Sequence, residues 1–177
     1  YRDRFRSLKE NKMKTIADAT ILIHLAKAGK IDLLSKIFDT IIIENEVYRE
    51  ILERGEAHSE VPIIKKLIEE GYILVREVSN IIDMPHLDEG EKRSISLCKE
   101  MNISSLLIDE EEGFNIALML HLSPIRTTSL LIILLDRGLI SLKEYESSLR
   151  SISESGYFLD AVTYERLITL GKNIAKK

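Results

Sequence analysis

Residues 15–27, TIADATILIHLAK, carry a short β-strand-like segment directly into an apolar helix-like one, with Asp18 at the junction. The segment over residues 15–18 has the length and composition of a short strand. From Thr20 onward the apolar residues recur at helical spacing, which predicts a helix over residues 20–27. The stretch therefore predicts a βα unit with an acid at the carboxyl end of its strand.

The same alternation continues to about residue 140. We expect further strands over residues 40–45, 72–78, 104–109 and 124–127. Helices are expected over residues 31–38, 46–54, 61–70, 88–101, 111–122 and 129–137. Short apolar strands separated by helices are typical of parallel sheets. The predicted fold class is three-layer α/β/α with a parallel sheet of about five strands, plus C-terminal helices.

Three segments are distinguished along the chain. Residues 1–12 precede Met13 and are interpreted as an N-terminal extension or a tag remnant. Residues 13–140 form the predicted α/β domain, and its length is enough to bury a sizeable core. Residues 141–177 form a charged helical hairpin around the sequence GYFLD, which we expect to pack on the same domain.

The composition is that of a globular chain, with 45% apolar and 31% charged residues. A net charge of -4 argues against nucleic-acid binding by the overall charge of the protein. Nucleic acid would have to be bound by a local basic rim or through metal ions. The single cysteine, Cys98, excludes an intramolecular disulfide and suits a reducing compartment. With no visible signal peptide or membrane span, we expect a cytoplasmic protein without a membrane partner.

Two aspartates end predicted strands: Asp18 closes the first, and Asp109 closes the strand over residues 104–109. In open parallel sheets, ligands bind beyond the carboxyl ends of the strands. A single aspartate in this position is more often a helix cap. Two of them, from separate strands, favour a shared site.

Two glutamates on predicted helices extend this set. Glu91 lies one turn before Ile95 and two turns before Cys98, so it shares the apolar side of its helix. A carboxylate there is costly without a partner, although an acid in a first helical turn also gains from the helix dipole. Glu50, beside Ile51, repeats the pattern more weakly, and an ordinary solvated glutamate is the alternative.

Four converging carboxylates repel each other, and a bound cation would relieve the repulsion. Oxygen donors without histidine or cysteine ligand spacing suit Mg²⁺ or Mn²⁺, ions that activate water and stabilise charge on a phosphodiester. The histidines lack zinc-ligand spacing, and neither a P-loop nor GxGxxG is present. The basic residues that could border the pocket, each with a solvated-face alternative, are Arg49, Lys92, Arg93 and Arg126.

The stretches ADATILIHLAKAGKIDLL, IIIENEVYREIL, LDEGEKRSISL and LLIDEEEGFNIALML resemble, in order, the motifs of the PIN-domain family. The stretch GLISLKEYESSLRSISESGYFLDAVTYERLI is similar to the C-terminal tail of its VapC-like, mostly archaeal and bacterial branch. Each motif is loose when taken alone. The ordered set is more specific, and it covers the chain from Met13 to about Gly171.

The resemblance implies a metal-dependent endoribonuclease that acts on single-stranded or structured RNA. Such proteins are often the toxin of a toxin–antitoxin pair, with an antitoxin protein as partner, and often homodimers. By position, the resemblance implies a set of four acids that hold metal and carry catalysis: Asp18, Glu50, Glu91 and Asp109. Thr20 matches the hydroxyl companion of the first acid.

The chain departs from the family pattern in three places. Glu110 stands where a second aspartate is usual, so Glu110 or Glu112 is an alternative metal ligand. Phe114 replaces the usual arginine, and Arg126-Thr127 replaces a Gly-Thr pair. We expect Thr20, Arg126 and Thr127 to contact substrate, with Arg126 either crowding the pocket or holding phosphate.

The departures leave open an alternative, a PIN-like module with weak or no catalysis that binds RNA or a protein partner. A phospho-accepting receiver domain would need an acidic pair after its first strand, and ADAT offers a single aspartate.

Overall fold

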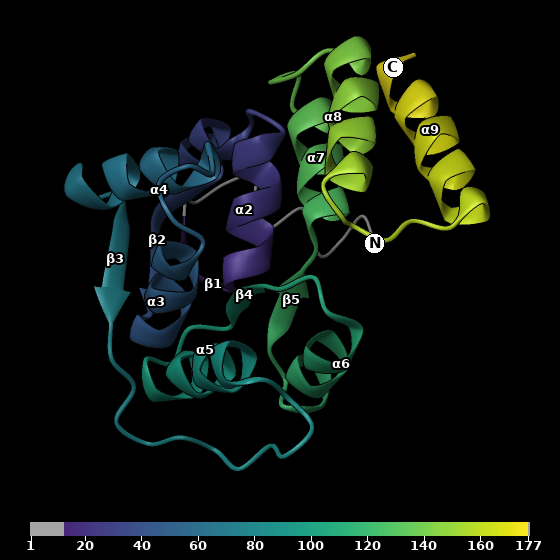
Figure 1. Cartoon of the computed structure of the whole chain (residues 1–177). Coiled ribbons are helices and arrows are strands. Elements are labelled where there is room, and N and C mark those ends of the chain that lie inside the picture. The colour runs from purple at the N-terminus through teal and green to yellow at the C-terminus, as the bar shows by residue number, and fades with distance from the viewer. Residues whose placement is uncertain (1–12, 177) are drawn as a thin grey trace.

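The computed structural model describes residues 13–176 and has helices on both faces of a central sheet (Figure 1). Within these residues the sheet has five parallel strands in the order β3-β2-β1-β4-β5. The strands are β1 (Met13–Ala17), β2 (Phe38–Glu44), β3 (Ile73–Arg76), β4 (Ser105–Leu107) and β5 (Ser123–Ile125). The predicted fold class is confirmed. The predicted N-terminal extension, residues 1–12, lies outside the described residues.

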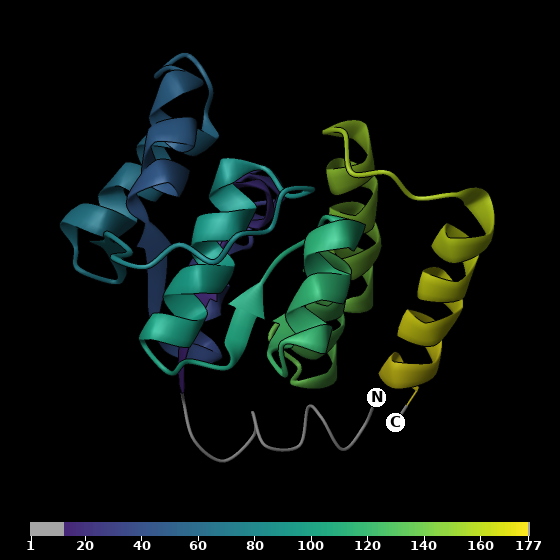
Figure 2. The same ribbon diagram turned by 90° about the horizontal axis from the view of Figure 1, so that it is seen from below.

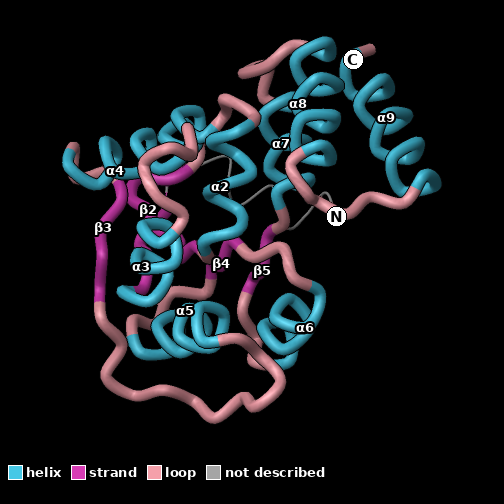
Figure 3. Tube along the Cα trace, in the orientation of Figure 1, coloured by secondary structure: helices cyan, strands magenta, loops and turns pink. Residues whose placement is uncertain are grey.

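Helices separate the strands along the chain, as the alternating colours of Figure 3 show. They are α2 (Ala19–Lys27), the 3-10 helix η2 (Ile31–Lys36), α3 (Asn45–Glu53), α4 (Glu60–Glu69), α5 (Glu89–Glu100), α6 (Glu111–Met119), α7 (Thr127–Asp136), α8 (Leu142–Glu154) and α9 (Ala161–Ala175). Among residues 13–176, no helix combines the length and the apolar character that crossing a bilayer requires.

Side chains alternate between the two faces of the sheet, as the period of a strand requires. In β2, Ile41 and Ile43 belong to the larger core cluster, whereas Ile42 belongs to the smaller one. In β4, Leu107 belongs to the larger cluster and Leu106 to the smaller. Helices α2, α4 and α7 contribute to the larger cluster, and α5 and α6 to the smaller, which gives three layers.

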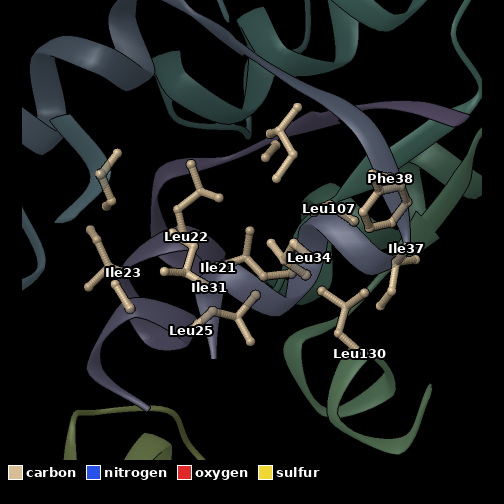
Figure 4. Close-up of a cluster of buried hydrophobic side chains, with 14 of the residues drawn as sticks. Ile21, Leu22, Ile23, Leu25, Ile31, Leu34, Ile37, Phe38, Leu107 and Leu130 are labelled. Atoms are coloured by element: carbon tan, nitrogen blue, oxygen red, sulfur yellow. The ribbon is translucent and has the colours of Figure 1, made fainter. Parts of the chain in front are cut away.

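The larger cluster joins α2, η2, β4 and α7 (Figure 4). Its labelled side chains lie side by side and include Ile21, Leu22, Leu25, Leu34, Phe38, Leu107 and Leu130. Each large apolar side chain that is removed from water contributes about 1.5–3 kcal/mol to the free energy of unfolding. This packing fixes the start of α2, and with it the position of Asp18.

The C-terminal hairpin packs against the same core. Tyr145, Leu149 and Ile152 of α8 are fully buried in the larger cluster, and the Tyr145 hydroxyl donates to the Leu167 carbonyl of α9 at 3.1 Å. A Cβ at Gly171 would lie 2.5 Å from Cε1 of Tyr145, so a glycine is needed for α9 to approach α8 this closely. Figure 2 shows α9 on the outer side of the α7–α8 pair.

Most predicted boundaries shift by one to three residues, and two of these shifts have a clear physical reason. Residues 31–38 were expected to form one helix, but η2 ends at Lys36 and Phe38 is the first residue of β2, paired with Met13. Because Ile37 and Phe38 are both fully buried, the chain must turn into the sheet there. The last strand, expected over residues 124–127, ends at Ile125, and Thr127 begins α7 because its N–H donates to Asp109.

The position of Phe38 predicts a stability difference between two neighbouring residues. Phe38→Ala should lower the free energy of unfolding by about 3–5 kcal/mol, because it opens a cavity in the core. Asp39→Ala, at an exposed position of the same strand, should change it by less than about 0.5 kcal/mol. Denaturant unfolding measures both values. Equal losses would contradict the placement of Phe38 in the core.

Candidate functional site

Asp18 and Asp109 lie beyond the carboxyl ends of the neighbouring strands β1 and β4. The Asp18 N–H donates to the Leu107 carbonyl at 3.0 Å, which ties the two strand ends together. Both aspartates are buried, with exposed fractions of 4% and 8%. The sheet therefore brings these two predicted site residues to one end of the molecule.

Asp18 caps the N-terminus of α2. Its Oδ2 accepts a hydrogen bond from the Thr20 N–H at 3.3 Å, and Thr20 itself is only partly buried. Burial raises the pKa of Asp18 to about 6, with a further contribution from the charge of Asp88. Hydrogen bonds from Thr20 and Ala19 oppose this change but do not outweigh it.

Three groups orient the Asp109 carboxylate. Its Oδ1 accepts from the Thr127 N–H at 2.8 Å, and its Oδ2 accepts from the Thr127 hydroxyl at 2.6 Å. Oδ2 also lies 3.2 Å from Nδ1 of His24, whose ring packs edge-on against Tyr157. Thr127 is fully buried, so in this structure it holds Asp109; its predicted substrate contact stays a prediction.

Glu91 and Asp88 form the capping box of α5. The Glu91 N–H donates to Asp88 Oδ1 at 2.8 Å, and Glu91 Oε2 accepts from the Asp88 N–H at 3.3 Å. The other oxygen, Glu91 Oε1, is buried without a hydrogen-bond partner. Burial, followed by the charges of Asp88 and Asp18, raises the pKa of Glu91 to about 7. A buried orphan oxygen is costly and is suited to a ligand.

Two glycines let the glutamates approach other elements closely. A Cβ at Gly90 would collide with the Glu50 carboxylate, which reaches over from α3. A Cβ at Gly113 of α6 would lie 2.6 Å from Glu91 Oε1. The pKa of Glu50 is raised to about 7 by burial and then by the charges of Asp18 and Asp88. The site therefore needs small residues where α5 meets α3 and α6.

We call Asp18, Glu50, Asp88 and Glu91 the acid cluster, because each of these charges acts on at least one of the others. Asp109 stands beside this cluster, and the structure shows its own contacts to be with Thr127 and His24. Glu110 is exposed and adds to the potential at Glu91, whereas Glu112 is exposed on α6. Within the acid cluster, Asp88 was not identified from the sequence. The spacing of Asp88 and Glu91 is that of a capping box, which indicates the start of a helix rather than a site.

His24 and Tyr157 are further residues that the sequence did not identify. His24 lies on the α2 helix, one of whose faces is apolar, and Tyr157 lies in the α8–α9 connection. Burial, and then the charge of Asp109, raise the pKa of Tyr157 to about 12, and Thr128 and Arg126 oppose this rise without outweighing it. The C-terminal hairpin thus reaches the end of the sheet where Asp109 lies.

The chemistry of the acid cluster fits a hard divalent cation. Its donors are carboxylate oxygens, one of which is buried without a partner, and mutual repulsion disfavours their charged forms. Within residues 13–176, the side chains form no group of three or more acids, histidines or cysteines placed to hold a metal ion. A cation bound there would require these carboxylates to come closer together, and it would offset their mutual repulsion.

The predicted basic rim is mostly neutralised. Arg49 pairs with Glu46 at 3.0 Å and Lys92 with Glu89 at 2.8 Å. Arg93 lies 3.3 Å from Glu89 and 3.6 Å from Glu44. The guanidinium of Arg126 lies 4.5 Å from the centroid of the Phe114 ring, so the two main departures from the resembled pattern contact each other.

A model of the PIN-domain family matches residues 14–173. Among solved structures, the chain is similar to a PilT N-terminus domain protein from the hyperthermophilic archaeon Sulfolobus solfataricus. The two share 16% sequence identity with a TM-score of 0.46, over 65% of this chain and 87% of the other. No curated protein sequence matches.

The raised pKa values predict how stability depends on pH in metal-free buffer. Asp18 binds its proton more tightly in the folded state, so protonation of this carboxyl group adds to the free energy of unfolding. This contribution is complete below about pH 4 and is lost as pH rises through about 6. Asp18→Asn keeps a good N-cap but removes the charge. We expect the variant to gain on the order of 1–2 kcal/mol at pH 8 and nothing at pH 4. Thermal melts at both pH values measure this, and a loss at pH 8 would make Asp18 only a cap.

Gly113 provides a second test of the cluster. In Gly113→Ala, the added methyl group should displace the Glu91 carboxylate and weaken Mn²⁺ binding by about 10-fold. Asn115→Ala, on the exposed side of α6, is the matched control and should leave the affinity unchanged. Titration calorimetry with Mn²⁺ compares the two variants. An unchanged affinity in Gly113→Ala would show that Glu91 does not contact the ion.

Proposed function

The chain belongs to the PIN-domain family, whose members are generally nucleases, and we propose that it is a metal-dependent endoribonuclease. Its substrate would be single-stranded or structured RNA, and its cofactor Mg²⁺ or Mn²⁺. The proposal assigns metal binding to Asp18, Glu50, Glu91 and Asp109, with Glu110 as a further ligand. Asp88 joins this set because its charge acts on Asp18, Glu50 and Glu91.

The observation that carries the proposal is the buried, unpartnered Oε1 of Glu91 inside a group of acids. A carboxylate needed only for the capping box would use one oxygen for the Asp88 N–H and expose the other to water. Here the second oxygen is buried against Gly113 instead. Such an arrangement costs stability in the free protein and becomes favourable when a cation binds.

The protein's own groups hold the carboxylates ready. Thr20 orients Asp18, while Thr127 and His24 orient Asp109, so two acids on neighbouring strands have restricted positions. A bound divalent ion supplies charge neutralisation at the phosphodiester and a more acidic water. Carboxyl groups with pKa values of about 7 in the free protein also exchange protons readily near neutral pH.

The second candidate is a PIN-like module with weak or no catalysis that binds RNA or a protein. The observations that favour it are the Phe114 and Arg126 departures and the lack, within residues 13–176, of preformed coordinating groups.

We extend the main proposal to a toxin role with an antitoxin partner and to a homodimer. Apolar side chains that are exposed on the C-terminal hairpin, Phe158, Val162 and Leu170, would suit contact with a second protein.

Cleavage assays test the main proposal. With Mg²⁺ or Mn²⁺, the protein should cut single-stranded RNA, and a chelator should abolish cutting because phosphodiester hydrolysis needs charge neutralisation. Asp18→Asn and Glu91→Gln should each lower kcat/KM by about 100-fold or more, since ligands act as a unit. Glu69→Gln, an exposed acid of α4, is the control and should retain activity.

Absence of cutting would decide between the two candidates. If neither the wild-type protein nor Arg126→Gly, which restores the usual family residue, cleaves a range of RNAs with either metal, the nuclease proposal is wrong. Retained RNA binding in the same samples would then support the binding module.

A further inference from the structure

Arg126 is distinguished from the other basic residues at the rim by its charge environment. Arg49, Lys92 and Arg93 each form ion pairs with glutamates. Within residues 13–176, Arg126 has no carboxylate within salt-bridge distance. Its positive charge therefore stays available to an anionic ligand.

Arg126 is also held in place. Its guanidinium stacks over the Phe114 ring at 4.5 Å, and it lies near enough to the Tyr157 hydroxyl to lower the pKa of that group. Neither contact neutralises the charge, because an aromatic ring and a phenol carry no full negative charge. Ring stacking restricts a long side chain whose ordering would otherwise cost entropy on binding. The residue is thus prepared to bind without losing its charge.

The fold places this side chain beside the acids. Leu107 of β4 pairs with Ile125 of β5, so Asp109 and Arg126 follow neighbouring strands at the same end of the sheet. Thr127, the next residue, binds Asp109 through both its N–H and its hydroxyl. The packing of Arg126 on Phe114 directs the guanidinium toward α6, and the hydrogen-bond partners of Asp109 are Thr127 and His24. Arg126 therefore does not compete for the Asp109 carboxylate.

We propose that Arg126, held between Phe114 and Tyr157, binds a backbone phosphate of single-stranded RNA next to the phosphate that is cleaved. The inference rests on the proposed function, and it makes Phe114 and Tyr157 positioning residues. A guanidinium offers planar, paired donors to phosphate oxygens, and it keeps that capacity when one face is stacked on a ring. The α8–α9 connection, which carries Tyr157, becomes part of the RNA-binding surface.

The test is equilibrium binding of a labelled oligouridylate in EDTA, where no metal-dependent cleavage occurs, over a series of salt concentrations. Arg126→Ala should weaken binding by about 10-fold at low salt. The slope of log affinity against log salt should fall in magnitude by about 0.7, the value for one lost contact to a single strand. Arg166→Ala, an exposed arginine of α9 outside this rim, should change neither quantity.

Two further variants separate phosphate binding from a structural role. Arg126→Lys should keep the salt slope of the wild type, because the charge remains. Phe114→Leu should weaken binding and leave the slope unchanged, because it frees the guanidinium without removing it. In cleavage assays, Arg126→Ala should raise KM more than it lowers kcat.

The inference is overturned if Arg126→Ala keeps the wild-type slope, if it behaves like Arg166→Ala, or if the wild-type protein does not bind the oligonucleotide. If Arg126→Ala lowers kcat and the melting temperature but leaves KM unchanged, Arg126 is a structural residue. The binding result does not depend on cleavage. A reduced slope in a protein that cuts no RNA would leave the phosphate contact of Arg126 standing, while the nuclease proposal and the placement of that contact beside a cleaved phosphate fail.

Discussion

The burial of like-charged carboxyl groups at one end of the sheet is the constraint on which this structure depends. Parallel strands deliver their last residues to the same edge, so acids that follow separate strands must share space. Asp18 follows β1, and helices α3 and α5 bring Glu50 and Glu91 to it. Burial, and then the charges of neighbouring acids, raise the pKa values of these three carboxyl groups to about 6 to 7. The strand end and the two helices thus gather acids whose charged forms are unfavourable, and a cation would relieve this.

The same chain contains ordinary caps that show what these acids would be without that constraint. Asp160 caps α9 at an exposed position, and hydrogen bonds from Thr163 lower its pKa. Glu144 closes the capping box of α8, and hydrogen bonds with Ser141 and Lys30 lower its pKa to about 2. Asp18 and Glu91 occupy equivalent capping positions, yet their pKa values are raised. Capping therefore explains where these acids sit but not their burial among other acids.

The fold was largely predictable because its signals are local. The β-branched run over residues 40–45 and the helical spacing after Asp18 each specify an element without reference to distant residues. The boundary at Phe38 was missed because a buried residue fits a helix or a strand equally well in a short apolar run. Only the pairing of Phe38 with Met13 decides between the two, and that pairing belongs to the tertiary fold.

The site was less predictable because its contacts join distant parts of the chain. His24 and Asp109 are 85 positions apart, so no spacing pattern connects them. Asp88 had a local signal, but the capping box of Ser141 and Glu144 at the start of α8 gives the same one, so the signal indicates a helix start and not a site. The strand-end position of Asp18 and Asp109 was informative because the topology of a parallel sheet converts it into proximity.

The contact between Phe114 and Arg126 changes how the two departures from the family pattern are interpreted. Taken separately along the sequence, one removes a cation from α6 and the other places a bulky residue where glycine is usual. In the structure the ring and the guanidinium stack on each other, so a positive charge lies directly beside Phe114. The stacking holds the guanidinium against α6, whereas the Asp109 carboxylate is bound by Thr127 and His24. The pair therefore places at the rim, within residues 13–176, a cation that no ion pair neutralises.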